Sequence, residues 1–124
     1  MVKPYKIIEK SGLKIGILGI GIELSGLVPK NLYGNTQYLD PISTANKYAA
    51  ILKRDEACDY VICLSHLGYK YDDEPNLVSD VILSQNTKNI DLIIGGHTHT
   101  FMDKPDIRKN LDGKEVHILS LIHI

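Results

Sequence analysis

Three histidines lie directly after runs of apolar residues, and this placement is typical of a metal site. His97 and His99 follow the segment IDLIIGG at 90–96, and His66 follows YVICLS at 60–65. Neutral imidazole is the commonest metal ligand in proteins at physiological pH, and Zn–N bonds of ~2.0 Å require several ligands to converge. We therefore expect His66, His97 and His99 to bind a divalent metal ion.

Small residues beside the histidines have supporting roles in this hypothesis. Gly95 and Gly96 let the backbone turn sharply, so that both following imidazoles aim at one point, and Gly68 allows the same beside His66. Hydroxyl groups can orient metal-bound imidazoles through hydrogen bonds. The candidates are Ser65, Thr98 and Thr100, although a plain loop hydroxyl is the simpler interpretation of each threonine.

The elements that would position these residues are buried strands alternating with helices. The segment 4–20 is expected to form a hairpin around Ser11 and Gly12, because glycine takes a positive φ without steric cost. Its second arm, 13–20, is almost wholly apolar, as expected for a strand covered on both faces. Further strands are expected at 60–64, at 91–96 and, after the turn at Asp112 and Gly113, at 114–122.

Two helices are expected between these strands. Asp40 can cap a helix with Pro41 in its first turn, and an apolar stripe with the helical period then extends to Leu52. The segment 21–40 before it is expected to be a long loop, which is typical of a functional or mobile segment. A second helix is expected from about 75 to 85, with an inward face formed by Leu77, Val78, Val81 and Ile82.

This order of elements predicts an α/β fold with a mixed, largely parallel sheet and an N-terminal β-hairpin. Ligands of such sheets gather at the carboxyl ends of the strands, where Ser65-His66 and the segment 95–99 both fall. The 124 residues suffice for one domain. If the strands before His66 and His97 are neighbours, their exit loops lie side by side.

Composition argues against several classes of protein. A formal net charge of -1 and 6% aromatic residues do not indicate binding to a nucleic acid polymer. No apolar window approaches the ~20 residues of a membrane span, and residues 1–10 lack the apolar core of a signal peptide. The two cysteines form no disulfide framework, and Cys63 is expected to be a small buried apolar residue.

The glycine-rich segment GILGIGIELSG at 16–26 is similar to a dinucleotide-binding turn only in part. Leu24 occupies the position of the third glycine of G-x-G-x-x-G, and the strand before it belongs to a hairpin. We therefore reject dinucleotide binding.

Taken together, three segments resemble the metallophosphatase domain of the 5'-nucleotidase family, a branch of the calcineurin-like metallophosphoesterases. They are KPYKIIEKSGLKIGILGI at 3–20, VICLSHLGY at 61–69 and IDLIIGGHTHTF at 90–101. The helix segment YLDPISTANKYAAILK at 38–53 also matches that family. The resemblance covers residues 3 to 119.

The resemblance implies part of an αββα sandwich with two divalent metal ions at the strand ends. His66 and His97 would ligate the second ion and His99 the first; Zn, Mn, Fe and Mg are not distinguished. The implied activity is hydrolysis of phosphate esters, with nucleotides as the expected substrates, by a water that two metals activate. The family also suggests export to the periplasm or cell surface.

The sequence departs from the family in one respect that limits this expectation. The family's Asp-x-His block, its bridging Asp and its Gly-Asn-His-Glu block do not occur in the 124 residues. We therefore expect residues 1–124 to be one incomplete domain, its second half, which alone is inactive and binds at most one metal ion weakly. Its expected partners are the missing N-terminal half and a C-terminal nucleotidase domain in cis or on a separate chain.

Two alternative functions stay open on the residues alone. One is a non-enzymatic module with a structural, His-rich metal site, although closed structural zinc sites usually include cysteine. The other is a different reaction of the same superfamily, such as hydrolysis of a cyclic nucleotide or of a sulfur ester. Titration with metal and the sequence encoded upstream of Met1 would separate these alternatives.

Overall fold

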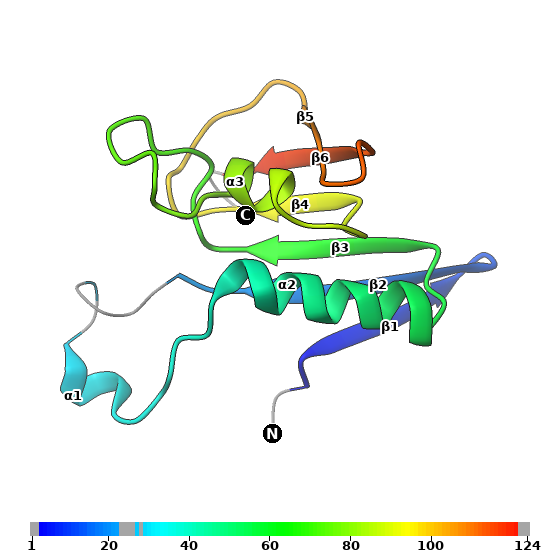
Figure 1. Ribbon diagram of the computed structural model, residues 1–124, viewed down its shortest axis with the longest axis horizontal. Coiled ribbons are helices and arrows are strands. Elements are labelled where there is room, and N and C mark those ends of the chain that lie inside the picture. Colours follow the sequence, from blue (N-terminus) through cyan, green and yellow to red (C-terminus); the bar gives the residue numbers. More distant parts are fainter. Residues whose placement is uncertain (1–2, 23–26, 28, 122–124) are drawn as a thin grey trace.

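The computed structural model describes residues 3–22, 27 and 29–121, and these form a six-stranded mixed sheet in the order β1-β2-β3-β4-β6-β5 (Figure 1). The strands are β1 (Tyr5–Lys10), β2 (Leu13–Ile20), β3 (Tyr60–Ser65), β4 (Leu92–Gly95), β5 (Asp106–Lys109) and β6 (Glu115–Ser120). The helices are α1 (Lys30–Tyr33), α2 (Pro41–Ala50) with its π-helical continuation η1 (Ile51–Asp55), and α3 (Asp80–Gln85). Leu24, which the rejected dinucleotide-binding pattern involves, lies outside the described residues.

The N-terminal hairpin and the parallel centre of the sheet confirm the predicted fold class. β1 and β2 pair antiparallel around Ser11 (φ 52°) and Gly12 (φ 81°), as a type I′ turn requires. β2, β3, β4 and β6 are parallel to one another. The strands that precede His66 and His97 are therefore adjacent, and their carboxyl ends meet at one edge of the sheet.

One strand was not predicted from the sequence. β5 pairs antiparallel with β6 at the edge of the sheet, across the turn that contains the expected Asp112 and Gly113. Its sequence, DIRK, has three charged residues and only one apolar side chain, because an edge strand needs little burial. It therefore lacks the apolar run by which the buried strands were recognised.

The first predicted helix is present with its predicted cap. The Asp40 carboxylate accepts a hydrogen bond from Ser43 N (2.8 Å), and Pro41 occupies the first turn. Ala45, Ala49 and Leu52 are fully buried against the sheet. The expected loop 21–40 contains one short helix, α1, among its described residues.

The second predicted helix is shorter than expected, since it begins at Asp80 and not near residue 75. Ser79 is extended (φ -128°, ψ 174°), and its side chain accepts a hydrogen bond from Ile82 N, which fixes the start of the helix. Val81 is buried as predicted, whereas Leu77 is 43% exposed and lies in the preceding loop. Leu83 is a fully buried apolar residue of this helix that was not predicted.

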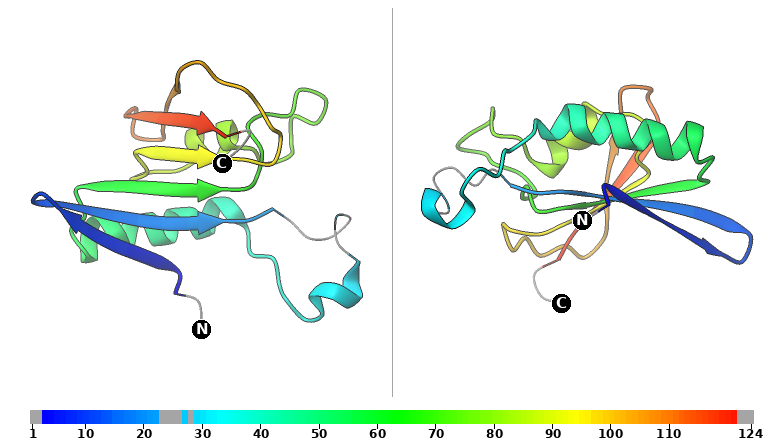
Figure 2. Two further views of the ribbon diagram at one scale, coloured as in Figure 1. Left: turned by 180° about the vertical axis from the view of Figure 1, so that it is seen from behind. Right: turned by 90° about the horizontal axis from the view of Figure 1, so that it is seen from below.

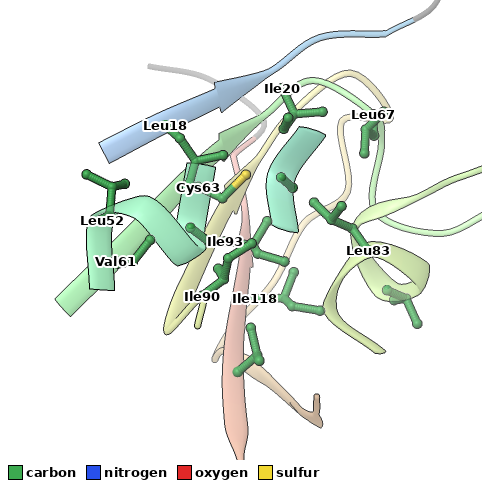
Figure 3. Packing of buried hydrophobic residues seen from close by; sticks show 14 of the residues in the cluster. Leu18, Ile20, Leu52, Val61, Cys63, Leu67, Leu83, Ile90, Ile93 and Ile118 are labelled. Atoms are coloured by element: carbon green, nitrogen blue, oxygen red, sulfur yellow. The ribbon is translucent and has the colours of Figure 1, made fainter. Parts of the chain in front are cut away.

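Both main helices pack on the same face of the sheet, which we call the inner face (Figure 2). The core lies between this face and the helices, and Leu18, Val61, Cys63, Ile93 and Ile118 project into it (Figure 3). The expectation that 13–20 is covered on both faces is wrong for the described residues, because β2 alternates between buried and partly exposed positions. The opposite, outer face is not covered by a helix within the described ranges (Figure 2).

Burial is the main cause of the neutral state of Cys63, and the nearby charge of Asp80 acts in the same direction. Cys58 and Cys63 are both free and buried, and burial raises the pKa of Cys63 to about 12. Cys63 is therefore a neutral core residue, as expected. No helix in the part of the chain that the structure describes is long and apolar enough to cross a membrane.

Candidate functional site

His66 and His97 come together at the carboxyl ends of β3 and β4. Their ring centroids are 5.0 Å apart, and the rings meet edge to face at 66°. The backbone N–H of His66 donates to Ile20 O (2.9 Å), which fixes the exit from β3 against the end of β2. Two imidazoles that are distant in the sequence thus face each other because their strands are parallel neighbours.

The turn after β4 is made by the histidines themselves. His97 (φ 74°) and His99 (φ 51°) have left-handed backbone conformations, whereas Gly95 and Gly96 have no positive φ. The positive φ values of this turn therefore lie at the histidines, and the role expected for the two glycines stays a prediction. A positive φ is uncommon for residues other than glycine, and such strain is concentrated at functional sites.

Two of the three predicted glycines, Gly95 and Gly68, have other atoms where a Cβ would lie, whereas Gly96 has only ordinary van der Waals distances around it. A Cβ at position 95 would lie 3.0 Å from Asp80 Cγ and would overlap Asp80 Oδ2. A Cβ at position 96 would lie 3.5 Å from His66 Nδ1. Gly68 has φ 98°, and a Cβ there would lie 2.7 Å from Thr98 Cγ2.

The predicted hydroxyl residues connect the two histidine loops. Thr98 Oγ1 accepts a hydrogen bond from Tyr69 N (3.0 Å) and is 3.0 Å from Thr100 Oγ1. Ser65 Oγ accepts from Leu67 N (3.1 Å) and so shapes the exit from β3. The hydrogen bonds found for these residues in the described part of the chain join backbone and hydroxyl groups, not imidazoles.

The histidines border an open hollow of about 940 Å³ at the strand ends, on the outer side of the sheet. His99, which does not form the ring contact of the other two histidines, also borders this hollow. The remaining lining is mostly apolar or glycine, and it comprises Gly19, Ile20, Gly21, Leu64, Ser65, Ile94, Gly95, Gly96 and Leu121. A ligand in this hollow would therefore meet imidazoles but no carboxylate from these residues.

The donor set fits only part of a metal centre. Among the described residues, no three or more His, Cys, Asp or Glu side chains are grouped so that they could hold a metal ion. His66 and His97 supply two imidazoles in contact, and His99 supplies a third at the same hollow but not in that group. Divalent metals need further ligands, such as carboxylates, from outside this set.

Asp80 was missed by the sequence reasoning, although it lies directly behind the site. Its side chain is fully buried, and neither carboxylate oxygen has a hydrogen-bond partner in the described structure. Burial raises the pKa of Asp80 to about 6, and the neighbouring Ser65 hydroxyl offsets part of this rise. An acidic residue at a helix start is usually a partner of the helix dipole, so the sequence carried no signal of this burial.

Comparison of the sequence with known proteins shows which class of proteins the chain resembles. No family model matches the chain. It is 30% identical over 112 residues to the trifunctional nucleotide phosphoesterase protein YfkN of Bacillus subtilis, covering 88% of the chain and 7% of the relative. It is 31% identical over 116 residues to the 5'-nucleotidase of Vibrio cholerae, covering 88% of the chain and 21% of that enzyme.

Solved structures agree with these relatives. The NAD nucleotidase of Haemophilus influenzae superposes with a TM-score of 0.71 at 26% identity, over 94% of this chain and 24% of that one. The calcineurin-like phosphoesterase YfkN of Bacillus subtilis superposes with a TM-score of 0.66 at 30% identity, over 82% and 34%.

The mixed sheet with histidines at its carboxyl edge is thus that of a calcineurin-like phosphoesterase. Within this class, the chain belongs to the 5'-nucleotidase family, as the sequence resemblance predicted. The chain spans about a fifth of the length of the Vibrio nucleotidase that it matches.

Proposed function

We propose that the protein to which this chain belongs hydrolyses phosphate esters, with nucleotides as substrates. The observation that carries the proposal is the contact of the His66 and His97 rings at the ends of two neighbouring parallel strands. The relatives named as nucleotidases and phosphoesterases support the same reaction class.

In this proposal, His66, His97 and His99 hold divalent metal together with carboxylate ligands from another part of the domain. Two bound divalent ions would lower the pKa of a water molecule and neutralise charge on the phosphate ester. Both imidazoles of the contacting pair must be neutral to bind metal, so acid would weaken binding. The role of His66 and His97 in this proposal is to direct their ring nitrogens into the hollow. The positive φ of His97 helps to orient its ring in this way.

We further propose that residues 1–124 are the second half of a metallophosphatase domain and that the first half covers the outer face. The register places apolar side chains side by side on this face: Ile17, Ile62 and Leu92 form one row, and Leu64, Ile94 and Leu119 form the next. Leu64 is 47% exposed and Tyr60 is 37% exposed. An apolar sheet face of this kind favours a covering layer.

The proposal also includes a location and a further domain. The relatives that are called 5'-nucleotidase suggest an exported protein, and a base-binding C-terminal domain would supply substrate choice. Fractionation of cells that produce the natural full-length protein tests the first point. A protein that stays with the cytosolic fraction would contradict it.

The enzymatic proposal predicts the effect of removing a ligand. We expect His66→Ala and His97→Ala, made in the natural full-length protein with Mn²⁺ or Zn²⁺ supplied, each to lower turnover of a nucleoside monophosphate at least about a hundredfold, because outer partners alone already change activity by 10–100-fold. His117→Ala is the matched control, since His117 lies on β6 away from the hollow.

Three results would count against this assignment. Near wild-type turnover in either variant would contradict the role of that histidine. Hydrolysis of a cyclic nucleotide but not of a monophosphate would favour the other reaction of the superfamily. Tight binding of one Zn²⁺ without any hydrolysis would favour a structural metal site.

A further inference from the structure

Asp80 is a buried charge whose position the fold alone does not explain. It is 0% exposed on the inner face of the sheet, and both carboxylate oxygens lack a hydrogen-bond partner among the described residues. A buried carboxylate without partners is costly, and each such group in a native protein calls for a physical reason. An apolar residue of similar volume would fill the same space at lower cost.

The contacts of the carboxylate point to the histidine loops. On one side it lies against Gly95, so closely that a Cβ at position 95 would overlap its Oδ2 atom. On another side the carboxylate neighbours Ser65, whose hydroxyl lowers the pKa of Asp80 by favouring the charged form. Gly95 and Ser65 are the last residues of β4 and β3, and the histidine loops begin directly after them. Asp80 therefore lies behind the base of both loops.

The backbone around Asp80 is anchored to the loop that carries His66. Asp80 N donates to Gly68 O (2.7 Å), and Val81 N donates to Tyr69 O (3.2 Å). Tyr69 N in turn donates to Thr98 Oγ1 of the other loop (3.0 Å). The start of α3 is thus fixed to one histidine loop, while its first side chain contacts the strand end that begins the other.

We propose that Asp80 is a positioning residue that sets the separation of the His66 and His97 rings by holding the end of β4 at Gly95. The support is steric, since it comes from the shape of the carboxylate and from the lack of a side chain at position 95. Asparagine has nearly the same shape and preserves this support, whereas alanine removes it. The consequence for metal binding rests on the proposed function, but the geometric role does not.

The test uses the full chain with the flanking sequence that its gene encodes, so that the outer face has its natural environment. The variants are Asp80→Asn, Asp80→Ala, Gly95→Ala and the double variant Asp80→Ala/Gly95→Ala. Leu83→Ala is the matched control, because Leu83 is a fully buried residue of the same helix and its loss destabilises the core without removing the contact with Gly95.

The primary measurement is the nuclear Overhauser cross-peak between the ring protons of His66 and His97 in the metal-free protein, whose ring centroids are 5.0 Å apart. We expect the cross-peak in the wild type, Asp80→Asn and Leu83→Ala, and its loss in Asp80→Ala and Gly95→Ala. The double variant should recover it, because the new methyl group fills the space that the carboxylate left. Zn²⁺ affinity should fall about tenfold in Asp80→Ala and stay near wild type in Asp80→Asn.

An unchanged cross-peak in Asp80→Ala and Gly95→Ala would overturn the proposal, as would its loss in Leu83→Ala to the same extent. Should Gly95→Ala not fold, a folded double variant with the cross-peak supports the proposal, and an unfolded one contradicts it. Hydrolysis is not measured here. A wild-type protein that hydrolyses no phosphate ester would therefore contradict the proposed function but not the positioning role of Asp80.

Discussion

Several residues at the strand ends lower the stability of the fold while they shape the candidate site. His97 and His99 adopt left-handed backbone conformations that cost free energy, and Asp80 is buried without hydrogen bonds. Both costs occur within one region, beside the contact of His66 and His97. Proteins commonly break local rules of stability where function requires a particular geometry, and this region follows that pattern.

The buried carboxyl of Asp80 makes stability depend on pH. Its folded-state pKa of about 6 lies above the ordinary value of 3.8, so the folded protein binds one more proton than the unfolded chain between these values. Stability from this group is therefore fully present below about pH 4 and is lost as pH rises through about 6, with a total change of about 3 kcal/mol. Asp80→Asn should abolish this part of the pH dependence.

Urea denaturation of the wild type and of Asp80→Asn between pH 4 and pH 8 measures the effect. The neutral variant should be the more stable one at pH 8, and the difference should shrink as the pH falls. An equal pH dependence in both proteins would show that Asp80 is not the buried acid responsible.

At the scale of elements, close packing between α2 and β2 fixes the hairpin to the rest of the sheet. Gly16 on β2 faces Leu52 of η1, the continuation of α2, and a Cβ at position 16 would lie 2.8 Å and 2.9 Å from the two methyl carbons of Leu52. Cys58 Sγ would be 3.1 Å away. The strand can therefore lie under this helix only because residue 16 has no side chain.

We expect Gly16→Ala to lower the free energy of unfolding by about 1–3 kcal/mol, because the added methyl group overpacks the contact. Thermal or urea denaturation measures the loss. Gly113→Ala is not a fair control, because Gly113 has φ 75°. Gly19→Ala is suitable, since its nearest neighbour would be Leu64 O at 4.0 Å, and it should change stability by less than about 0.5 kcal/mol.

Sequence patterns predicted the elements that bury continuous apolar runs and failed where tertiary contacts decide. β3 and β4 were recognisable because both are apolar throughout, and α2 because Asp40 and Pro41 mark its start. β5 was not, since a charged edge strand resembles a loop. The start of α3 has a local signal in the Ser79 cap, which the apolar pattern did not include. It is also held by bonds from Asp80 and Val81 to the loop after β3, which no local pattern encodes.

The candidate site likewise has features that the sequence predicted and features that depend on tertiary contacts. The chain crossings that bring His66 beside His97 followed from the α/β order, because parallel neighbouring strands end at one edge. The left-handed turn at His97 did not follow, since no local pattern marks a positive φ at a histidine. The contact of Asp80 with Gly95 did not follow either, since it depends on how α3 packs behind the sheet. Convergence of His99 with the other two imidazoles stays a prediction.

At the scale of the whole molecule, the asymmetry of the sheet is the dominant feature. Helices pack on the inner face (Figure 2). The outer face has apolar rows with partly exposed leucine and tyrosine. Tyr60, Leu64 and Leu121 are 37%, 47% and 39% exposed, and Ile8 on β1 is 39% exposed. Such a surface promotes association when it is left in water.

We expect the 124-residue chain, produced alone, to associate in solution, and replacement of Ile62 and Leu64 by threonine to reduce that association. Both residues lie on a central strand, and threonine keeps a high preference for strands while adding a hydroxyl group. Sedimentation velocity compares the two proteins. A wild-type chain that stays monomeric at high concentration would contradict the proposal of a missing covering layer.

The bond between Tyr69 N and Thr98 Oγ1 has a consequence for natural variation. Position 98 must offer an oxygen for this bond, whereas position 69 is constrained by its side chain, because Tyr69 Oη donates to Asp106 Oδ2 (2.6 Å) and the ring packs against the core. Serine should be the common replacement of Thr98. That replacement should not free position 68 to vary, because Gly68 has φ 98° and an added Cβ there would still meet the Tyr71 ring. Glycine should therefore persist at 68 whether threonine or serine occupies 98.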